Sequence, residues 1–202
     1  MVAADTTGDS RLDRRDAVAK IMARLGDDAL FVTGLGSPSY DVHAAGDRDN
    51  IYYLWGAMGA AALVGLGIAQ AQPDRHVVVI TGDGEQLMAF GALATIAVAR
   101  PKNLDLMILD NQHFGETGMQ SSHTGQGIDL AAVAATCGFA HTETVSTDAG
   151  LEAAITTLAG KANGPRFFTI KISDVPAPRS LPVRDATFIK NRFRGHLGLA
   201  PS

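Results

Sequence analysis

Short apolar runs alternate with amphipathic stretches over most of the chain, which is the pattern of an α/β protein. Strand-like apolar runs occupy residues 29–33, 51–54, 76–81, 105–109, 141–145 and 166–172. Helix-like segments occupy residues 10–25, 57–71, 86–99, 129–137 and 148–162, the first with Ser10 as its N-cap. Because strands alternate with helices, we expect a three-layer, doubly wound parallel sheet.

Polar and glycine-rich segments separate the predicted elements. Residues 34–39 are predicted to be a turn-rich loop, and residues 41–50 an exposed connection because they hold three acids, an arginine and a histidine. Residues 112–127 contain four glycines and form a long loop, and long loops within compact domains are often functional. The tail, residues 173–202, has four prolines and scattered apolar side chains, so it either packs along its own domain or docks on a partner.

Length and composition favour one globular domain. The 202 residues are 46% hydrophobic and 19% charged, so we expect a flexible N-terminus at residues 1–9, one domain at residues 10–172 and the tail. A net charge of −4 argues against a nucleic-acid surface. No signal peptide is visible, and the uncharged residues 54–71 are rich in alanine and glycine, which favours a buried helix over a membrane span. The expected location is the cytoplasm.

Two predicted strands end in residues with the chemistry of a metal and phosphate site. One strand runs into Gly82-Asp83-Gly84 and the next into Asp110-Asn111. The carboxyl edge of a parallel sheet is where α/β proteins bind phosphorylated ligands. Carboxylate and amide oxygens suit Mg²⁺, and glycines let backbone N–H groups approach a diphosphate. A dinucleotide fingerprint or a P-loop would need other glycine and lysine spacings.

The spacing of these residues resembles the diphosphate-binding motif of thiamine diphosphate (ThDP) enzymes. The resemblance implies the fold of their diphosphate-binding (PP) domain. It also implies that Asp83, Asn111 and the backbone carbonyl of His113 hold Mg²⁺, and that Gly82 and Gly84 belong to the cofactor site. The first asparagine of the family's closing pair is an aspartate here, while the metal-ligating second one is kept.

Segments before the motif resemble the same family. Gly56 and Met58 are similar to residues that face the cofactor, with the Gly56 carbonyl on the 4′-amino group and Met58 under the thiazolium. The alternative for Met58 is a core residue. Gly34, Gly36 and Ser37 resemble a loop that wraps the diphosphate, for which a plain turn is the alternative.

Glu85 follows the motif where relatives commonly carry small residues. An acid beside a diphosphate is repulsive unless it points away. We therefore expect Glu85 at the cofactor site as an acid in the first turn of the helix that starts at Gln86, where it suits the helix dipole.

The long loop resembles the corresponding loop of sulfopyruvate and phosphonopyruvate decarboxylases. By that resemblance His113, Phe114 and Gly115 contact the cofactor, and the loop meets the substrate. His113 and His123 are histidines, which titrate near neutrality, and Glu116 carries a carboxylate, so these three are the candidate catalytic residues. Exposed loop histidines and a structural glutamate are the alternatives.

ThDP enzymes begin catalysis with a glutamate held against the pyrimidine ring by a separate domain, whereas every element predicted here belongs to one sheet. The resemblance covers about residues 12–172 and implies a β-type subunit completed by an α-type pyrimidine-binding partner that carries this glutamate, as an α2β2 or larger heteromer. The implied enzyme is a carboxy-lyase that uses ThDP and Mg²⁺ to convert a 2-oxo acid into CO₂ and an aldehyde.

Three other functions stay open. A carboligase shares the same reaction intermediate. The β subunits of 2-oxoacid:ferredoxin oxidoreductases use a similar motif, but Cys137 is the only cysteine and cannot ligate an iron–sulfur cluster alone. A non-catalytic ThDP-binding module is the third.

Overall fold

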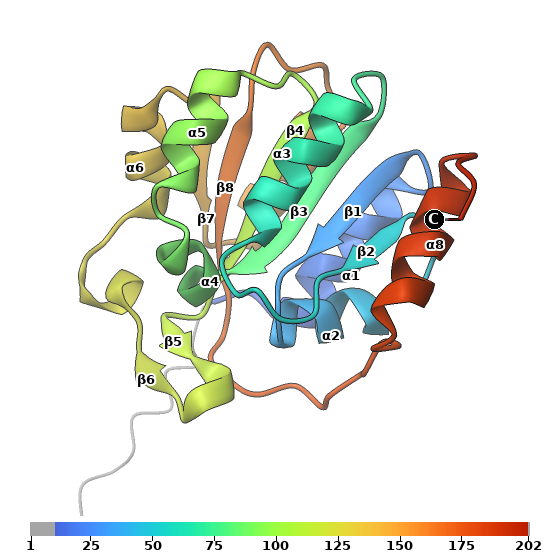
Figure 1. Cartoon of the computed structure of the whole chain (residues 1–202). Helices are drawn as coiled ribbons and strands as arrows, with labels where there is room; N and C mark the ends of the chain where they lie inside the picture. Colours follow the sequence, from blue (N-terminus) through green and yellow to red (C-terminus); the bar gives the residue numbers. More distant parts are fainter. Residues whose placement is uncertain (1–10, 202) are drawn as a thin grey trace, which may run out of the picture.

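The computed structural model describes residues 11–201, so the predicted N-terminus at residues 1–9 lies outside the described residues. A six-stranded parallel sheet in the order β2-β1-β3-β4-β8-β7 forms the centre (Figure 1). Its strands are β1 (Ala29–Thr33), β2 (Ile51–Tyr53), β3 (His76–Gly82), β4 (Leu104–Asp110), β7 (His141–Val145) and β8 (Arg166–Lys171). The long loop contains the paired β5 (His113–Phe114) and β6 (Gln120–Ser121) and the 3-10 helices η1 (Gly115–Thr117) and η2 (His123–Gln126).

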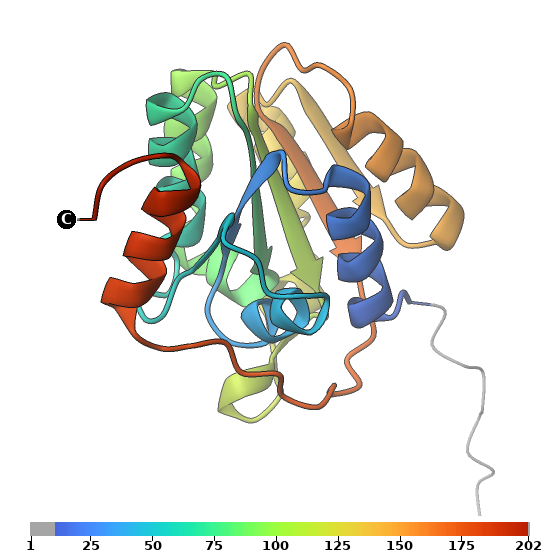
Figure 2. The ribbon, with the colours of Figure 1, turned by 90° about the vertical axis from the view of Figure 1, so that its right-hand side faces the viewer.

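Helices cover both faces of the sheet and give the predicted three layers (Figure 2). One face carries α1 (Arg14–Leu25), α2 (Ser37–Ala44) and α7 (Asp148–Leu158), and the other α3 (Ala61–Ala71), α5 (Ala92–Ala99) and α6 (Leu130–Cys137). Successive strand residues point to opposite faces, so Phe168 of β8 joins one apolar core and Phe167 the other. The predicted fold class is confirmed.

The sheet has a topological switch point at β1. The chain leaves β1 for β2 on one side and returns to β3 on the other, as the pairings of Phe31 with Ile51 and of Leu30 with Val77 show. Connections that diverge in this way leave a crevice at the carboxyl ends of the two central strands, and ligands of open α/β sheets bind there.

The predicted exposed connection at residues 41–50 is wrong in its first part. The chain there belongs to α2, which has Pro38 in its first turn. Asp41 is buried, and its carboxylate pairs with Arg14 at 2.7 Å and Arg15 at 2.6 Å. The local pattern could not reveal this because both arginines lie on α1.

Several predicted helices have different limits. The helix expected from a Ser10 cap begins at Arg14, with Asp13 as its N-cap, so the Ser10 cap is wrong. The helix expected over residues 148–162 ends at Leu158. The helix expected over residues 86–99 is split into α4 (Asp83–Met88) and α5. The helix expected over residues 57–71 begins only at Ala61. None of the helices in the described part of the chain is long and apolar enough to cross a membrane.

The tail packs along its own domain. It ends in a helix that the sequence did not predict, α8 (Ala186–His196), which lies beside the edge strand β2 (Figure 1). Ile189 joins the core on one face of the sheet and Phe193 the core on the other. Phe193 also meets Tyr52 of β2 edge-on, with ring centroids 5.7 Å apart. The helix therefore covers an edge of the sheet that would otherwise be open.

Candidate functional site

A cavity of about 360 Å³ opens at the switch point, beyond the carboxyl ends of β1, β3 and β4. Of the predicted site residues, its lining includes Ser37, Met58, Gly82, Asp83, Gly84, Glu85, Asn111, His113, Phe114, Gly115 and Glu116. Its lining does not include Gly34, Gly36, Gly56 or His123. The fold thus brings together residues from four separate segments of the chain.

Asp83 lines the cavity and is only 2% exposed. It follows the last residue of β3 and is the first residue of α4. Its Oδ2 accepts hydrogen bonds from the hydroxyl groups of Ser122 at 2.5 Å and Thr124 at 3.1 Å, both in the long loop. Sequence reasoning missed these two hydroxyl groups because only the folding of the loop brings them to the motif.

The surroundings of Asp83 carry an excess of negative charge. Oγ1 of Thr124 also lies 2.7 Å from Oδ1 of Asp110, a buried acid at the end of β4, so the one hydroxyl proton is shared between the two acids. Lys171 pairs with the other oxygen of Asp110. Burial raises the pKa of Asp83 to about 6; hydroxyl hydrogen bonds oppose this rise and the Asp110 carboxylate adds to it. A bound cation would compensate the charge of these neighbouring acids.

The residues after β4 supply further oxygen atoms. Oδ1 of Asn111 accepts the backbone N–H of His113 at 3.1 Å, and the His113 ring donates from Nδ1 to the Asn111 carbonyl at 2.8 Å, so Nε2 takes no part in this bond. Within residues 11–201 no three His, Cys, Asp or Glu side chains form a metal cluster. One carboxylate with amide and carbonyl oxygens is instead a donor set that suits Mg²⁺.

Glu85 holds two loops together. It is 3% exposed, and its Oε2 accepts the N–H of Leu35 at 2.7 Å, while Oε1 accepts those of Gly59 at 3.2 Å and Ala61 at 3.4 Å. Glu85 does lie in the first turn of a helix, but the expectation that this helix starts at Gln86 is wrong, because α4 starts three residues earlier. The Glu85 charge is stabilised by hydrogen bonds from three backbone N–H groups in addition to the helix dipole.

Two glycines of the site are required by close contacts. A Cβ on Gly34 would lie 2.1 Å from Oγ1 of Thr81 and 2.3 Å from Oε2 of Glu85. A Cβ on Gly84 would lie 2.7 Å from the Phe114 ring. Gly34 therefore supports the site by allowing the loop after β1 to approach β3 and α4.

Met58 lies in a turn with unusual backbone angles. Gly56, Ala57 and Gly59 have positive φ angles of 78°, 48° and 98°. Met58 between them is 41% exposed and lines the cavity, so the alternative that it is a core residue is wrong. A non-glycine residue such as Ala57 in this region costs about 1 kcal/mol or more, and such strain is concentrated at functional sites.

Glu116 connects the long loop to the tail. Its carboxylate pairs with Arg179 at 2.9 Å, and the Ser37 hydroxyl at the start of α2 donates to it at 3.3 Å. Further along the tail, the carbonyl of Val183 accepts the indole N–H of Trp55 at 2.9 Å. Residues 173–185, the connecting segment, thus contact two other parts of the chain, the long loop and the segment that precedes Met58. These partners lie far apart in sequence, so no local pattern could indicate them.

His123 is exposed at the first position of η2. The next residue, Thr124, is buried against Asp83 and Asp110. In this part of the loop the Thr124 hydroxyl group, and not the His123 imidazole, reaches Asp83.

Comparison with known proteins agrees with this geometry. Residues 39–170 match the family model described as thiamine pyrophosphate enzyme, C-terminal TPP binding domain. The chain is 39% identical over 135 residues to sulfopyruvate decarboxylase subunit beta of Methanocaldococcus jannaschii, an alignment that covers 67% of this chain and 70% of that one. It is 40% identical over 166 residues to phosphonopyruvate decarboxylase of Streptomyces hygroscopicus, covering 81% of this chain but only 40% of that protein.

Solved structures show the same fold. A ThDP-dependent 4-hydroxybenzoylformate decarboxylase from Rhodococcus jostii superposes with a TM-score of 0.69 at 21% identity, over 88% of this chain and 35% of that one. A putative ThDP-dependent enzyme from Mycobacterium smegmatis gives the same score at 23% identity, over 82% of this chain and 32% of that one. The family match, the sequence relatives and the arrangement of Asp83 and Asn111 agree, so this chain belongs to the thiamine pyrophosphate enzymes, as their C-terminal TPP-binding domain.

Proposed function

We propose that the chain is the diphosphate-binding subunit of a heteromeric decarboxylase that uses ThDP and Mg²⁺ to convert a 2-oxo acid into CO₂ and an aldehyde. The observation that carries this proposal is the meeting of Asp83, Asn111 and Met58 at one cavity of the switch point. Similarity to a decarboxylase β subunit supports the reaction class.

The metal would be held by the side-chain oxygens of Asp83 and Asn111 and the carbonyl of His113. Asp110 is already paired with Lys171, so the buried Asp83 carboxylate and the oxygen-only donor set are what fit a divalent cation. The hydroxyl groups of Ser122 and Thr124 would keep the Asp83 carboxylate in position, since they already donate to Oδ2.

The cofactor would be held along the loops that Glu85 fixes. Backbone N–H groups near Gly82 and Ser37 would hold the diphosphate, because α2 starts at Ser37 without a side-chain cap on its first N–H groups. The Gly56 carbonyl and the Met58 side chain would position the rings. Bound ThDP supplies the carbon nucleophile and the electron sink that decarboxylation needs.

A partner subunit would complete the site. Among the lining carboxylates, Asp83 faces the metal position, Glu85 is occupied by three backbone N–H groups and Glu116 pairs with Arg179, so none is free to face a pyrimidine ring. At the cavity Met58 and Met88 are 41% and 62% exposed. Exposed apolar side chains of this kind mark an interaction surface. We therefore assign the catalytic glutamate to an α-type pyrimidine-binding subunit, in an α2β2 or larger assembly.

The same cavity restricts how the substrate's acidic group is bound. Its only Arg or Lys side chain is Arg14, which is engaged by Asp41. His113 is then the candidate in this chain for contacting the 2-oxo acid or moving a proton, through Nε2. Glu116 would position the long loop. His123 is exposed and does not line the cavity, so it would act on the substrate only if the long loop moved toward the cavity.

Partner dependence is the test of this proposal. The chain is purified alone and together with the product of the adjacent reading frame, and CO₂ release from sulfopyruvate, phosphonopyruvate and pyruvate is measured with ThDP and Mg²⁺. We expect turnover only from the pair. Decarboxylation by the isolated chain would show that no partner is needed, and failure of the pair to bind ThDP would contradict the cofactor assignment.

The same assay separates the remaining alternatives. An acyloin product in place of a free aldehyde would identify a carboligase. ThDP binding by the pair without turnover of any 2-oxo acid would identify a non-catalytic module. A ferredoxin oxidoreductase subunit is disfavoured because Cys137 is a lone cysteine on α6.

A further inference from the structure

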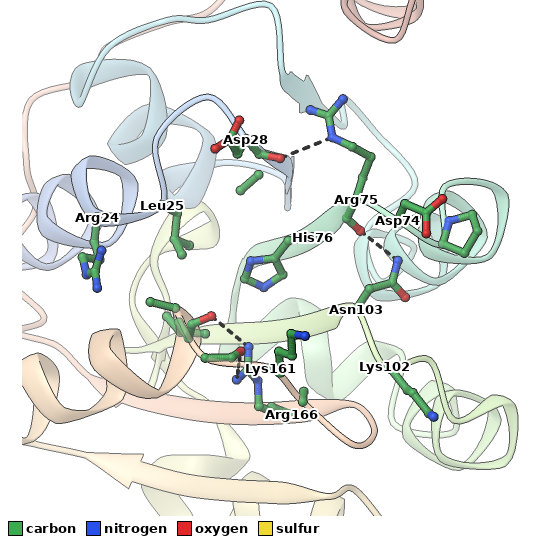
Figure 3. Close-up of a pocket in the computed structure, with 16 residues that line it drawn as sticks. Arg24, Leu25, Asp28, Asp74, Arg75, His76, Lys102, Asn103, Lys161 and Arg166 are labelled. Atoms are coloured by element: carbon green, nitrogen blue, oxygen red, sulfur yellow. Dashed lines mark hydrogen bonds between the residues drawn. The ribbon is translucent and has the colours of Figure 1, made fainter.

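A second cavity, of about 490 Å³, lies at the opposite, amino-terminal edge of the sheet (Figure 3). Its walls come from the end of α1, the start of β3, and the links that lead into β4 and β8. None of the cofactor-site residues lines it. A cavity of this size is in the range of small-molecule sites.

The base of this cavity is a fixed polar network. Buried Asp105 accepts two hydrogen bonds from Arg166, from Nε and from a terminal nitrogen, each at 2.6 Å. It also accepts one from Nε2 of His76 at 2.6 Å. Arg166 therefore compensates the charge of Asp105, and this buried pair adds no net charge to the cavity.

Several polar groups of the cavity serve the ends of helices. Arg166 also donates to the carbonyls of Thr157 and Leu158 at the end of α7. Asn103 donates to the carbonyl of Ala69 near the end of α3. Cations and amides at helix C-termini are a common stabilising device, so these groups need no ligand to explain them.

Two further cations, Lys102 and Lys161, lie in links between elements and have no such role, while Arg24 stands in the last turn of α1. Arg24, Lys102 and Lys161 line the cavity, and none of them has a salt bridge or hydrogen bond with any residue that the structure describes. Arg24 lies on α1, Lys102 in the link that leads into β4 and Lys161 in the link that leads into β8, and Figure 3 shows them at separate points around the cavity. In a chain whose net charge is −4, the lining cations Arg24, Arg75, Lys102 and Lys161 outnumber the two lining acids, Asp28 and Asp74, and such an excess of positive charge favours an anion.

The carboxylates of Asp28 and Asp74 line the same cavity, likewise without a partner within the described residues. Free carboxylates accept hydrogen bonds from hydroxyl and amino groups, while Leu25 and Pro73 offer apolar surface. A ligand that satisfies all of these groups carries several phosphate charges, hydroxyl groups and a flat apolar part. We propose that this cavity is a binding site for a nucleoside polyphosphate, separate from the cofactor site.

The two sites lie at opposite ends of the same strands. His76 begins β3, which ends beside Asp83, and Asp105 lies near the start of β4, which ends beside Asn111. A nucleotide at the amino-terminal edge therefore does not compete with ThDP.

The test is calorimetric titration of ATP into the full chain. We expect one saturable site, and we expect the double variant Lys102→Gln/Lys161→Gln to bind ATP about tenfold more weakly or worse, because each lysine would make a charge-assisted contact. Lys20→Gln, which removes a lysine charge from α1 outside the cavity, serves as the matched control and should leave the affinity unchanged. Circular dichroism confirms that the variants are folded; these three lysines are not in the core.

Two comparisons exclude other sites and ligands. ATP should bind equally to the Asp83→Ala chain, because the diphosphate site is not involved. Inorganic triphosphate should bind more weakly than ATP, because it lacks the hydroxyl groups and the base. Absence of saturable binding, an unchanged affinity in the double variant, loss of binding in Asp83→Ala, or triphosphate binding as tightly as ATP would each overturn the proposal.

Discussion

Glu85 accepts a hydrogen bond from the backbone N–H of Leu35 at 2.7 Å, although the two residues are 50 positions apart in the sequence. Its second oxygen accepts the N–H of Gly59 at 3.2 Å. One buried carboxylate thereby fixes the loop that follows β1 relative to the turn that carries Met58. The residue after the glycine–aspartate–glycine motif thus fixes two parts of the chain that line the cavity.

Replacing Glu85 by glutamine should loosen one of the two loops, because the amide keeps only one of the two acceptor oxygens. The amide NH₂ group would face backbone N–H groups that now have an acceptor, and leaving buried donors unsatisfied costs about 1–3 kcal/mol. We expect a loss of this size in the free energy of unfolding, measured by urea denaturation, together with weaker ThDP binding in the assembled enzyme. Glu152→Gln on the exposed face of α7 is the control. Equal stability of the two variants would mean that Glu85 does not hold the loops.

Asp83→Ala should abolish metal-dependent ThDP binding. Changing even an outer-shell partner of a metal site weakens metal affinity by about 10–100-fold, so loss of a direct ligand should exceed that range. ThDP affinity is measured by titration with Mg²⁺ and with EDTA, and Asp27→Ala, an exposed acid far from the motif, is the control. If the variant still required Mg²⁺ for tight binding, the metal would have to be assigned to other residues.

The pair between Glu116 and Arg179 should affect motion more than stability. Both side chains are substantially exposed, and exposed ion pairs contribute about 1 kcal/mol or less to stability. We expect Arg179→Met and Glu116→Gln to leave unfolding almost unchanged but to speed hydrogen exchange in residues 112–127. The double variant should show no more than the larger single effect, whereas additive effects would mean that the pair is not coupled. Arg194→Met on α8 controls for loss of charge.

Two glycines on α3 should respond in opposite ways to alanine. A Cβ on Gly65 would lie 2.3 Å from Cγ2 of Val79 on β3, whereas one on Gly67 meets nothing within 4 Å. We expect Gly65→Ala to destabilise the chain by about 1–3 kcal/mol through overpacking. Gly67→Ala should stabilise it by about 0.5–1 kcal/mol, because alanine favours the helix. Thermal and urea unfolding measure both, and a reversed order would mean that α3 does not pack on β3 as described.

Arg166→Met should be among the more damaging single changes. It leaves the buried Asp105 with only His76 as a partner, and removal of one member of a buried pair costs about 3–5 kcal/mol. The double variant Asp105→Asn/Arg166→Met should recover part of this loss because no charge is left uncompensated. Urea denaturation measures both variants. A double variant less stable than Arg166→Met alone would contradict this account.

The sequence by itself determined the sheet and one edge of the site. The apolar runs that became β3 and β4 are long, and their ends carry Asp83 and Asn111, so both the strands and their polar termini were visible in a short window. Parallel pairing then places the two residues side by side, since strands joined by a helix present their carboxyl ends at the same edge.

Only the tertiary structure decided what surrounds these residues. Ser122, Thr124 and Leu35 reach Asp83 and Glu85 because loops fold back onto α4, and Arg179 reaches Glu116 across 63 positions. Such contacts depend on the closure of long loops, and no periodicity in the sequence encodes which polar group will meet which. The cavity at the other edge also depends on the tertiary structure. Arg24, Lys102 and Lys161 are separate surface residues in the sequence, and only the folded sheet places their segments around one cavity.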